Sequence, residues 1–300
     1  MKESVKSNEK RSINAAHIWG FINEANVTKL EDGKSAINMK VATYESFEKN
    51  GKKERRYTNH DVRLVTKNEE TVRSFEAIAK DIEANKANKD NKEYKIVAHT
   101  ISLDGHLRQN NFPGEDGNMV YSYRITTDDA NIKLDTKRGE NESMNSIEVK
   151  GNIAKINVFE KSAIIDVATH YIAPGFLNDN EGKPLGFQFE KDGRKLTQIP
   201  TFIQTRINEN RLPEVFAQIK NGELAVGDLI RTKGQMHEPT KDGNKLAGII
   251  IDVAPKTFNL VAKKAENKEQ AVEQKAEPAK KAAAAKKPAK KAEAKKGRTL

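Results

Sequence analysis

Apolar and polar residues alternate in several short stretches of this chain, as they do in β-strands with one buried face. The clearest stretch covers residues 36–43, where every second residue from Ile37 to Val41 is large and apolar. A strand over residues 16–22 precedes it, and a strand over residues 59–65 follows it. The chain therefore begins with three predicted strands.

Residues 68–82 change to a helical period, and Asn68 is suited to cap the first turn. Four apolar residues lie three or four positions apart and share one face: Val72, Phe75, Ile78 and Ile82. Two further strands are expected over residues 94–103 and 119–126, the first of them ending at Asp104-Gly105. The first half thus has the order strand, strand, strand, helix, strand, strand.

The second half repeats this order. Its expected elements are strands over residues 146–153, 163–169 and 201–207, a helix over residues 213–220, and strands over residues 229–235 and 246–253. Gly20 and Gly105 lie 85 positions apart, and Gly151 and Gly234 lie 83 apart. Two such units are typical of two tandem OB-folds, five-stranded Greek-key barrels with a helix between strands 3 and 4.

We therefore predict an all-β chain with short helices, divided into five segments. Residues 1–12 are disordered, residues 13–127 and 146–261 form the two OB-folds, residues 128–145 link them, and residues 262–300 form a disordered tail. The tail is a low-complexity sequence of Lys, Ala, Glu and Pro, which cannot bury a core.

Most of the positive charge lies in this tail. Residues 262–300 contain 13 Lys and Arg and 5 Asp and Glu, which accounts for +8 of the formal net charge of +10. The rest of the chain is close to neutral, so its partners must be inferred from local placement. A basic tail adds affinity for nucleic acid through counterion release, or it serves only to keep the chain in solution.

The expected loop over residues 44–56 combines cations with aromatic rings. Binding of a single nucleic-acid strand needs a cationic groove for the backbone and flat apolar faces for the unstacked bases. A solvated polar hairpin loop is the alternative. The candidate binding residues of this stretch and of the residue that follows it are Phe47, Lys49, Lys52, Lys53, Arg55, Arg56 and Tyr57.

Further candidates lie elsewhere in both units. Arg63, Arg108 and Arg206 are expected to contact the nucleic-acid backbone. The long loop over residues 171–198 carries Phe176, Phe187 and Phe189, together with Arg194 and Lys195. It is either a second binding loop or a lid packed on its own barrel.

Trp19 and Phe21 alternate with Ile18 and Ile22 and should point out of the first barrel. An outward Trp is either a platform for a base or a contact with another OB unit. We favour the contact between subunits or domains.

Three motifs carry a resemblance to a known family. They are Ala42-Thr43-Tyr44-Glu45-Ser46-Phe47 with His60 downstream, Asp104-Gly105-His106-Leu107-Arg108, and the passage from Pro213-Glu214-Val215-Phe216-Ala217 to Gly227-Asp228-Leu229-Ile230-Arg231-Thr232-Lys233-Gly234-Gln235-Met236. In these patches the chain resembles bacterial-type single-stranded-DNA-binding proteins, over roughly residues 14–126 and 146–254.

The resemblance implies base-stacking roles for particular aromatic residues. It implies such a role for Phe47, after the second strand, and for Phe112, past the strand-four glycine. At the third family position, on the third strand, this chain has Asn59 in the first unit and Phe202 in the second. The resemblance therefore implies stacking platforms that are split between the units.

The family usually ends in an acidic tail tipped by an aromatic residue, which recruits replication and repair proteins. The tail of this chain is basic and ends in Arg298-Thr299-Leu300, which is a departure from the family. A phage or mobile-element origin would suit this departure.

The sequence shows no pattern of catalytic or metal-binding residues. It has no Cys, its six His residues do not lie at ligand spacing, and it has no Walker loop or nucleophile–base arrangement. No apolar run approaches the roughly 20 residues that cross a bilayer, and the first residues lack the apolar core of a signal peptide. We expect a cytoplasmic binding protein, at the nucleoid or replication sites of a bacterial cell, with no enzymatic activity, metal or cofactor.

These observations predict sequence-independent binding of single-stranded DNA, which protects or organises the strand in replication, recombination or repair. A homodimer is expected, in which four OB units act together, with replication or recombination proteins as further partners. One alternative is a structural or packaging protein whose Lys-rich tail carries the binding. Another is RNA binding, because stacking and backbone contacts do not select the sugar.

Overall fold

The computed structural model describes residues 12–49, 51–110, 112–113, 119–120, 122–138, 144–179, 181–238, 240–241, 244–245 and 249–264. Most of the expected disordered ends, residues 1–11 and 265–300, lie outside the described residues. Strands dominate the described part of the chain, which has α-helices at two places.

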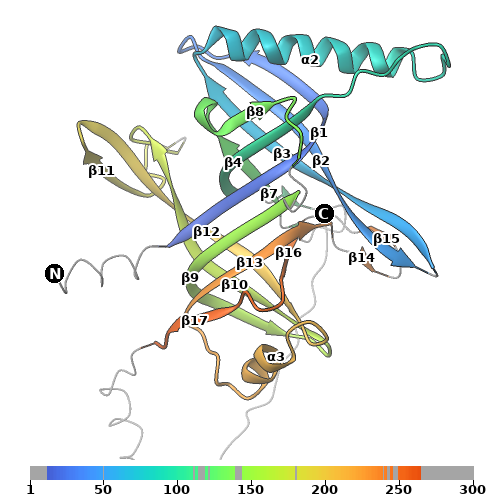
Figure 1. The fold of residues 1–300 in the computed structure, drawn as a ribbon. Helices are drawn as coiled ribbons and strands as arrows, with labels where there is room; N and C mark the ends of the chain where they lie inside the picture. Colours follow the sequence, from blue (N-terminus) through green and yellow to red (C-terminus); the bar gives the residue numbers. More distant parts are fainter. Residues whose placement is uncertain are drawn as a thin grey trace, which may run out of the picture. The chain divides into compact units, whose positions relative to one another are not determined.

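The described residues of the first half form eight strands, one α-helix and one 3-10 turn. Figure 1 shows how the main elements are arranged. In chain order they are β1 (Ile13–Lys29), β2 (Ser35–Lys49), β3 (Lys52–Thr66), α2 (Glu69–Ala87), β4 (Thr100–Gln109), β5 (Phe112–Pro113), β6 (Met119–Val120), β7 (Tyr123–Thr127), the 3-10 turn Asp129–Asn131, and β8 (Ile132–Leu134).

Five of these strands close into a ring. β1 pairs with β2 and β2 with β3 in antiparallel fashion, β3 pairs with β7 in parallel, and the antiparallel pairs β7–β4 and β4–β1 complete the circuit. Alternate residues point into the ring and are buried, among them Ile37, Leu64 and Leu103. The predicted alternation of buried and outward positions is therefore confirmed on these strands.

Helix α2 lies across one end of this ring (Figure 1). Asn68 caps its start, because the side-chain oxygen accepts hydrogen bonds from the next backbone N–H groups. Phe75, Ile78 and Ile82 are buried in the core, as the helical stripe predicts. The helix ends at Ala87, five residues beyond the predicted end.

The second half forms a ring of the same connectivity. Its elements are β9 (Asn145–Val158), β10 (Ser162–Pro174), β11 (Phe187–Lys191), β12 (Arg194–Asn208), α3 (Pro213–Lys220), β13 (Leu229–His237), β14 (Thr240–Lys241), β15 (Asn244–Lys245), β16 (Ile250–Val253) and β17 (Asn259–Ala262). β9, β10 and β12 pair in antiparallel order, β12 pairs with β16 in parallel, and β13 joins β16 back to β9. Helix α3 has the predicted bounds, with Pro213 at its start.

The sequence did not predict a sixth strand that follows each ring. β8 pairs with Ile101–Leu103 of β4, and β17 pairs with the equivalent segment of β13. β8 lies within the expected linker. The prediction for β4 was also wrong, because that strand begins at Thr100 rather than at Tyr94 and continues through Asp104-Gly105 to Gln109.

The two rings join through backbone pairing between β1 and β9. The register runs from Ile13↔Lys150 to Ile18↔Asn145 and includes Ala16↔Ile147. Ala16 and Ile147 are equivalent positions, since each lies four residues before the glycine that the two halves share. Equivalent residues therefore pair with each other, which is the register of a two-fold, self-complementary contact.

Side-chain contacts repeat across this junction. Asn14 donates through Nδ2 to the carbonyl oxygen of Leu107 (2.8 Å) and accepts from the N–H of Leu107 through Oδ1 (2.9 Å). Asn145 makes the same two bonds to Met236, at 2.6 and 3.1 Å. Each amide thereby satisfies both backbone groups of a buried residue on the fourth ring strand of its own half.

A glycine marks the point where one edge of β1 changes its partner. That edge pairs with β9 up to Ile18 and with β2 from Phe21 onward. A Cβ at Gly20 would lie 2.4 Å from the carbonyl oxygen of Ala42, and one at Gly151 would lie 2.0 Å from that of Ala168. Only glycine lets the incoming strand approach so closely.

We expect Asn14→Ala and Asn145→Ala each to lower the free energy of unfolding by about 1–3 kcal/mol, because each leaves two buried backbone groups without a partner. Asn26→Ala is the control, since Asn26 is exposed at the far end of β1, and it should change stability by less than about 0.5 kcal/mol. Urea unfolding monitored by circular dichroism measures all three. Equal stabilities would contradict a structural role for these amides.

Candidate nucleic-acid interface

The stretch over residues 44–56 was predicted to be a loop, and this prediction is wrong. β2 and β3 continue beyond the ring as a two-stranded ribbon, paired from Thr43↔Thr58 to Lys49↔Lys52 (Figure 1, blue). Gly51, with φ of 72°, reverses the chain at the tip. The sequence signal for such a ribbon is Asn50-Gly51, the dipeptide favoured in two-residue hairpin turns.

Strand alternation divides the candidate residues of this ribbon between its two faces. Arg56 and Lys52 continue the alternate positions of β3 that point into the ring, beginning with the buried His60. Lys53, Arg55 and Tyr57 occupy the outer face. The register pairs Phe47 with Glu54 and Lys49 with Lys52. For Phe47 and Lys49 the structure describes only the backbone. The predicted binding residues of this stretch therefore do not share one face.

The ribbon of β2 and β3 is the first arm of the protein. Its outer face carries a cluster of aromatic and cationic side chains. The rings of Tyr44 and Tyr57 lie 6.0 Å apart, tilted by 53°. The guanidinium carbon of Arg55 lies 4.6 Å from the ring centre of Tyr44, which is a cation–π contact. Tyr57 is 48% exposed. Tyr44 was not among the predicted binding residues. Alternation along β2 places it on the outer face, and the register pairs it with Tyr57.

Arg63 and Arg206 occupy equivalent positions in the two rings but have different partners. The parallel neighbour of Arg206 is Asp252, and its carboxylate accepts hydrogen bonds of 2.5 Å from Nε and 2.6 Å from Nη2. The parallel neighbour of Arg63 is Thr126, which has no charge. The charge of Arg206 is therefore balanced by Asp252, whereas Thr126 offers no carboxylate to Arg63.

The second predicted loop, over residues 171–198, is also largely built from strands. β10 extends to Pro174, β12 begins at Arg194, and β11 pairs with β12 along its outer edge. The turn between β11 and β12 is Asp192-Gly193, and both residues have positive φ, as a type I′ hairpin requires. We call this extension of β10 and β12, together with β11, the second arm. Phe187 lies on its outer face, and Phe202 lies on the same face where β12 enters the ring. Their side chains are 70% and 46% exposed.

The remaining candidates lie apart from these two faces. Phe176 follows β10, and the Nζ atom of Lys195 lies 5.3 Å from its ring centre. Arg108, at the end of β4, lies near Tyr171 of the second arm, where its charge opposes the rise that burial causes in the Tyr171 pKa. Phe112 lies on β5 and pairs with Val120. The structure describes only the backbone of Phe112.

Trp19 points away from the first ring core, as alternation predicts, but it is not exposed. Its Nε1–H donates to the carbonyl oxygen of Thr136 (3.2 Å), and its backbone N–H donates to that of Met144 (3.0 Å). Phe21 packs edge-on against it, with ring centres 5.6 Å apart. The segment between the two rings therefore covers Trp19.

Two buried histidines lie where the rings meet. The Nε2 atom of His60 shares a 2.9 Å hydrogen bond with the hydroxyl of Thr43. Burial, with a smaller contribution from the nearby His237, lowers the pKa of His60 to about 3. Burial also lowers the pKa of His237, against the carboxylates of Asp252 and Glu45. Both groups are therefore neutral at pH 7.

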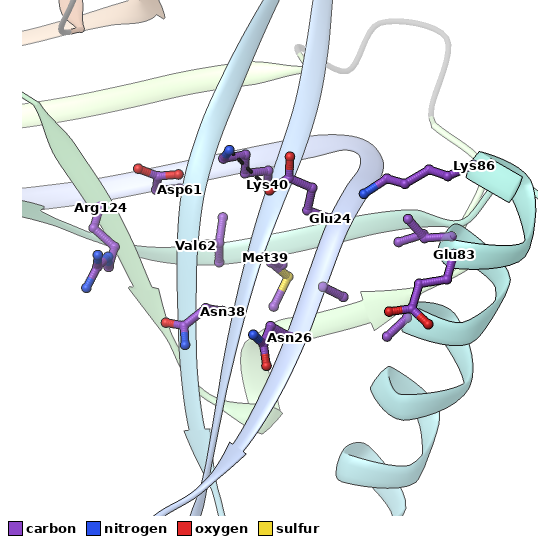
Figure 2. A pocket seen from close by; sticks show the side chains of 13 residues that line it. Glu24, Asn26, Asn38, Met39, Lys40, Asp61, Val62, Glu83, Lys86 and Arg124 are labelled. Atoms are coloured by element: carbon purple, nitrogen blue, oxygen red, sulfur yellow. Dashed lines mark ion pairs between the residues drawn. The ribbon is translucent and has the colours of Figure 1, made fainter.

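A pocket of about 400 Å³ lies between α2 and strands β1, β2 and β3 (Figure 2). Lys40 pairs with Glu24 at 3.1 Å, and Glu83 and Lys86 reach toward the strands from the helix. Three carboxylates balance three cations among its described lining residues, and none of the predicted binding residues is among them. The pocket therefore has no electrostatic preference for a nucleic-acid backbone.

Metal-binding clusters and membrane-spanning helices are both absent from the part of the chain that the structure describes. No cluster of three or more His, Cys, Asp or Glu side chains is arranged to bind a metal ion there. Within the same residues, no helix combines the length and apolar composition needed to cross a membrane.

We expect the stability of the protein to fall as pH decreases from about 6.5 toward 3. In this range the unfolded chain binds a proton at His60, since the pKa of an unperturbed histidine is about 6.5. The folded chain keeps His60 neutral down to about pH 3. His60 therefore contributes a slope of up to about 1.4 kcal/mol per pH unit. His60→Ile should remove this contribution, because Ile203 occupies the equivalent position. Parallel curves of unfolding free energy against pH for the unmodified chain and His60→Ile would contradict this contribution of His60.

Comparisons with known proteins give a structural likeness without a sequence match. No protein-family model and no curated protein matches the sequence. A deletion mutant of the single-stranded DNA binding protein from Thermus aquaticus shares 12% sequence identity at a TM-score of 0.46, over 86% of this chain and 98% of that one. The wild-type protein shares 11% identity at a TM-score of 0.44, over 83% and 93%. The chain is thus similar in structure to two forms of one single-stranded DNA binding protein from this bacterium.

Proposed function

We propose that this protein binds single-stranded DNA without sequence preference, and that each ring is an OB-fold. The proposal rests on one observation above all. The outer face of the second and third ring strands, which is the oligonucleotide-binding face of OB-folds, carries exposed aromatic side chains in both rings. In the first ring Tyr57 lies beside Arg55 and Tyr44, and in the second ring Phe202 stands at the position of Asn59.

Stacking and charge have separate roles in this proposal. Each base that stacks on an aromatic ring gains about 1–3 kcal/mol regardless of its identity, because every base has a π-face. Arg55, Lys53 and Arg63 lie on the same face and supply cations for the phosphates. Such a surface protects or organises a single strand in replication, recombination or repair, and no step of it requires catalysis.

The alternative function is nucleic-acid binding by the tail rather than by the rings. The near-neutral charge of the rest of the chain favours this alternative. Outside residues 262–300 the chain has a formal charge of only +2. A structural or packaging protein would bind nucleic acid mainly through the tail. In our proposal the tail adds affinity, a homodimer brings four rings together, and the rings themselves bind the strand.

We expect a chain that ends at Lys264, the limit of the folded unit, to keep its preference for oligo-dT over duplex of equal length. Fluorescence anisotropy over a salt series measures both affinities, with the full chain as reference. The salt slope of the full chain should be steeper, because the tail adds phosphate contacts at about 0.7 each on single strands. Loss of single-strand binding on truncation would instead support the tail alternative. A parallel series with oligo-rU tests RNA binding.

We expect Arg63→Gln to weaken single-strand binding and to reduce the salt slope by about 0.7, the value of one phosphate contact. Arg206→Gln is the matched control, and it should leave the salt slope unchanged because Asp252 already holds that guanidinium. It should instead lower stability by about 1–3 kcal/mol, since the carboxylate loses its charged donor. Equal effects of the two variants on the salt slope would refute the proposal that Arg63, but not Arg206, contacts a phosphate.

A further inference from the structure

The second arm is a three-stranded sheet whose outer face is largely apolar. β12 lies in the middle, with β10 on one side and β11 on the other. Both neighbours are in register with Gln198, which pairs with Ile172 of β10 and with Phe187 of β11. Two residues farther out, Phe189 pairs with Leu196. Side chains from all three strands therefore meet on one face.

These apolar side chains are unusually exposed. Phe187 is 70% exposed, Ile172 49% and Phe202 46%. The rings of Phe187 and Phe189 are stacked, with centres 6.0 Å apart and planes 19° apart. Exposed aromatic rings on an open sheet face offer the apolar π-faces on which bases stack.

The charges of the arm are sorted by face. Lys191 and Arg194 pair with each other across the hairpin turn and lie on the same face as Phe189 and Leu196. Glu190 pairs with Lys195, and alternation places both on the opposite face. The apolar face therefore ends in two cations that flank Asp192 of the turn, while the nearest carboxylate of β11, that of Glu190, lies on the opposite face.

We propose that this face is the main base-stacking surface of the protein and that a single strand runs along it from Phe202 to Lys191 and Arg194. Phe202 and Arg194 are eight residues apart on β12, about 27 Å along an antiparallel strand. Bases stack on Phe202, Phe187 and Phe189, and phosphates meet the cations at the tip. The inference rests on the proposed function and names the part of the second ring that carries it.

The order of side chains favours a nucleic acid over a protein as the occupant. A single strand needs rings and cations side by side along one path, and the face provides both in line. The first arm has an aromatic pair and the cations Lys53 and Arg55 on its outer face, but Asn59 takes the place of Phe202 there. The second arm therefore has the longer run of stacking side chains.

The test uses the full chain and the variant Phe187→Ala. Since Phe187 is 70% exposed, the fold does not depend on it. We expect the affinity for a dT oligonucleotide long enough to span both rings to fall by about tenfold or more. Phe159→Ala is the control, because Phe159 is 53% exposed in the turn between β9 and β10, away from the arm. Its affinity should equal that of the unmodified chain.

A charge variant tests the path independently. Lys191→Gln combined with Arg194→Gln should reduce the salt slope by about 1.4, at about 0.7 for each lost contact. Lys161→Gln, in the same turn as Phe159, should leave the slope unchanged. An unchanged slope in the double variant would remove the tip of the arm from the path.

The outcomes separate this inference from the proposed function. If the unmodified chain fails to bind single strands, the proposed function and the inference both fail. If it binds and Phe187→Ala binds equally well, only the inference is overturned. Sedimentation velocity covers the protein alternative, because a change in oligomeric mass with unchanged DNA affinity would identify the face as a protein contact.

Discussion

The backbone pairing of β1 with β9 is the contact on which the rest of the structure depends. A ring strand has two edges, and each edge must satisfy its N–H and C=O groups. One edge of β1 serves β9 first and β2 afterwards, and β9 divides its edge in the same way. Gly20 and Gly151 make this change of partner sterically possible. Two rings thereby share one continuous sheet without leaving an open edge between them.

The two-fold register of this pairing positions each arm against the opposite ring. The side chain of Gln109 accepts a hydrogen bond from the backbone N–H of Phe202 (3.3 Å), and Glu238 makes the equivalent long contact to Asn59 (3.5 Å). The end of the fourth strand in one ring thus touches the third strand of the other. The outer faces that carry the candidate site are therefore held by both rings.

The two rings have the same connectivity, but equivalent positions carry different side chains with different neighbours. These neighbours distinguish candidate residues that the sequence alone could not distinguish. Arg63 and Arg206 look alike in the sequence, but within the described residues Arg206 is the one of the two that forms an ion pair with a carboxylate. This follows from Asp252 on a strand more than forty residues away. The faces of the first ribbon were also predictable in part, since alternation separates Arg55 from Arg56 once the strands are known to continue to Gly51.

The sequence by itself determined the repeat, the stripe of α2 and the bounds of α3, because period, capping and spacing are local properties of the chain. The Asn50-Gly51 and Asp192-Gly193 dipeptides were local sequence signals too, because such dipeptides favour hairpin turns. Only the tertiary structure decided that β1 pairs with β9, and that β11 joins Phe187 to the face of Phe202. These depend on hydrogen bonds between distant segments and on which edge of a strand is free to accept them, which no local pattern encodes.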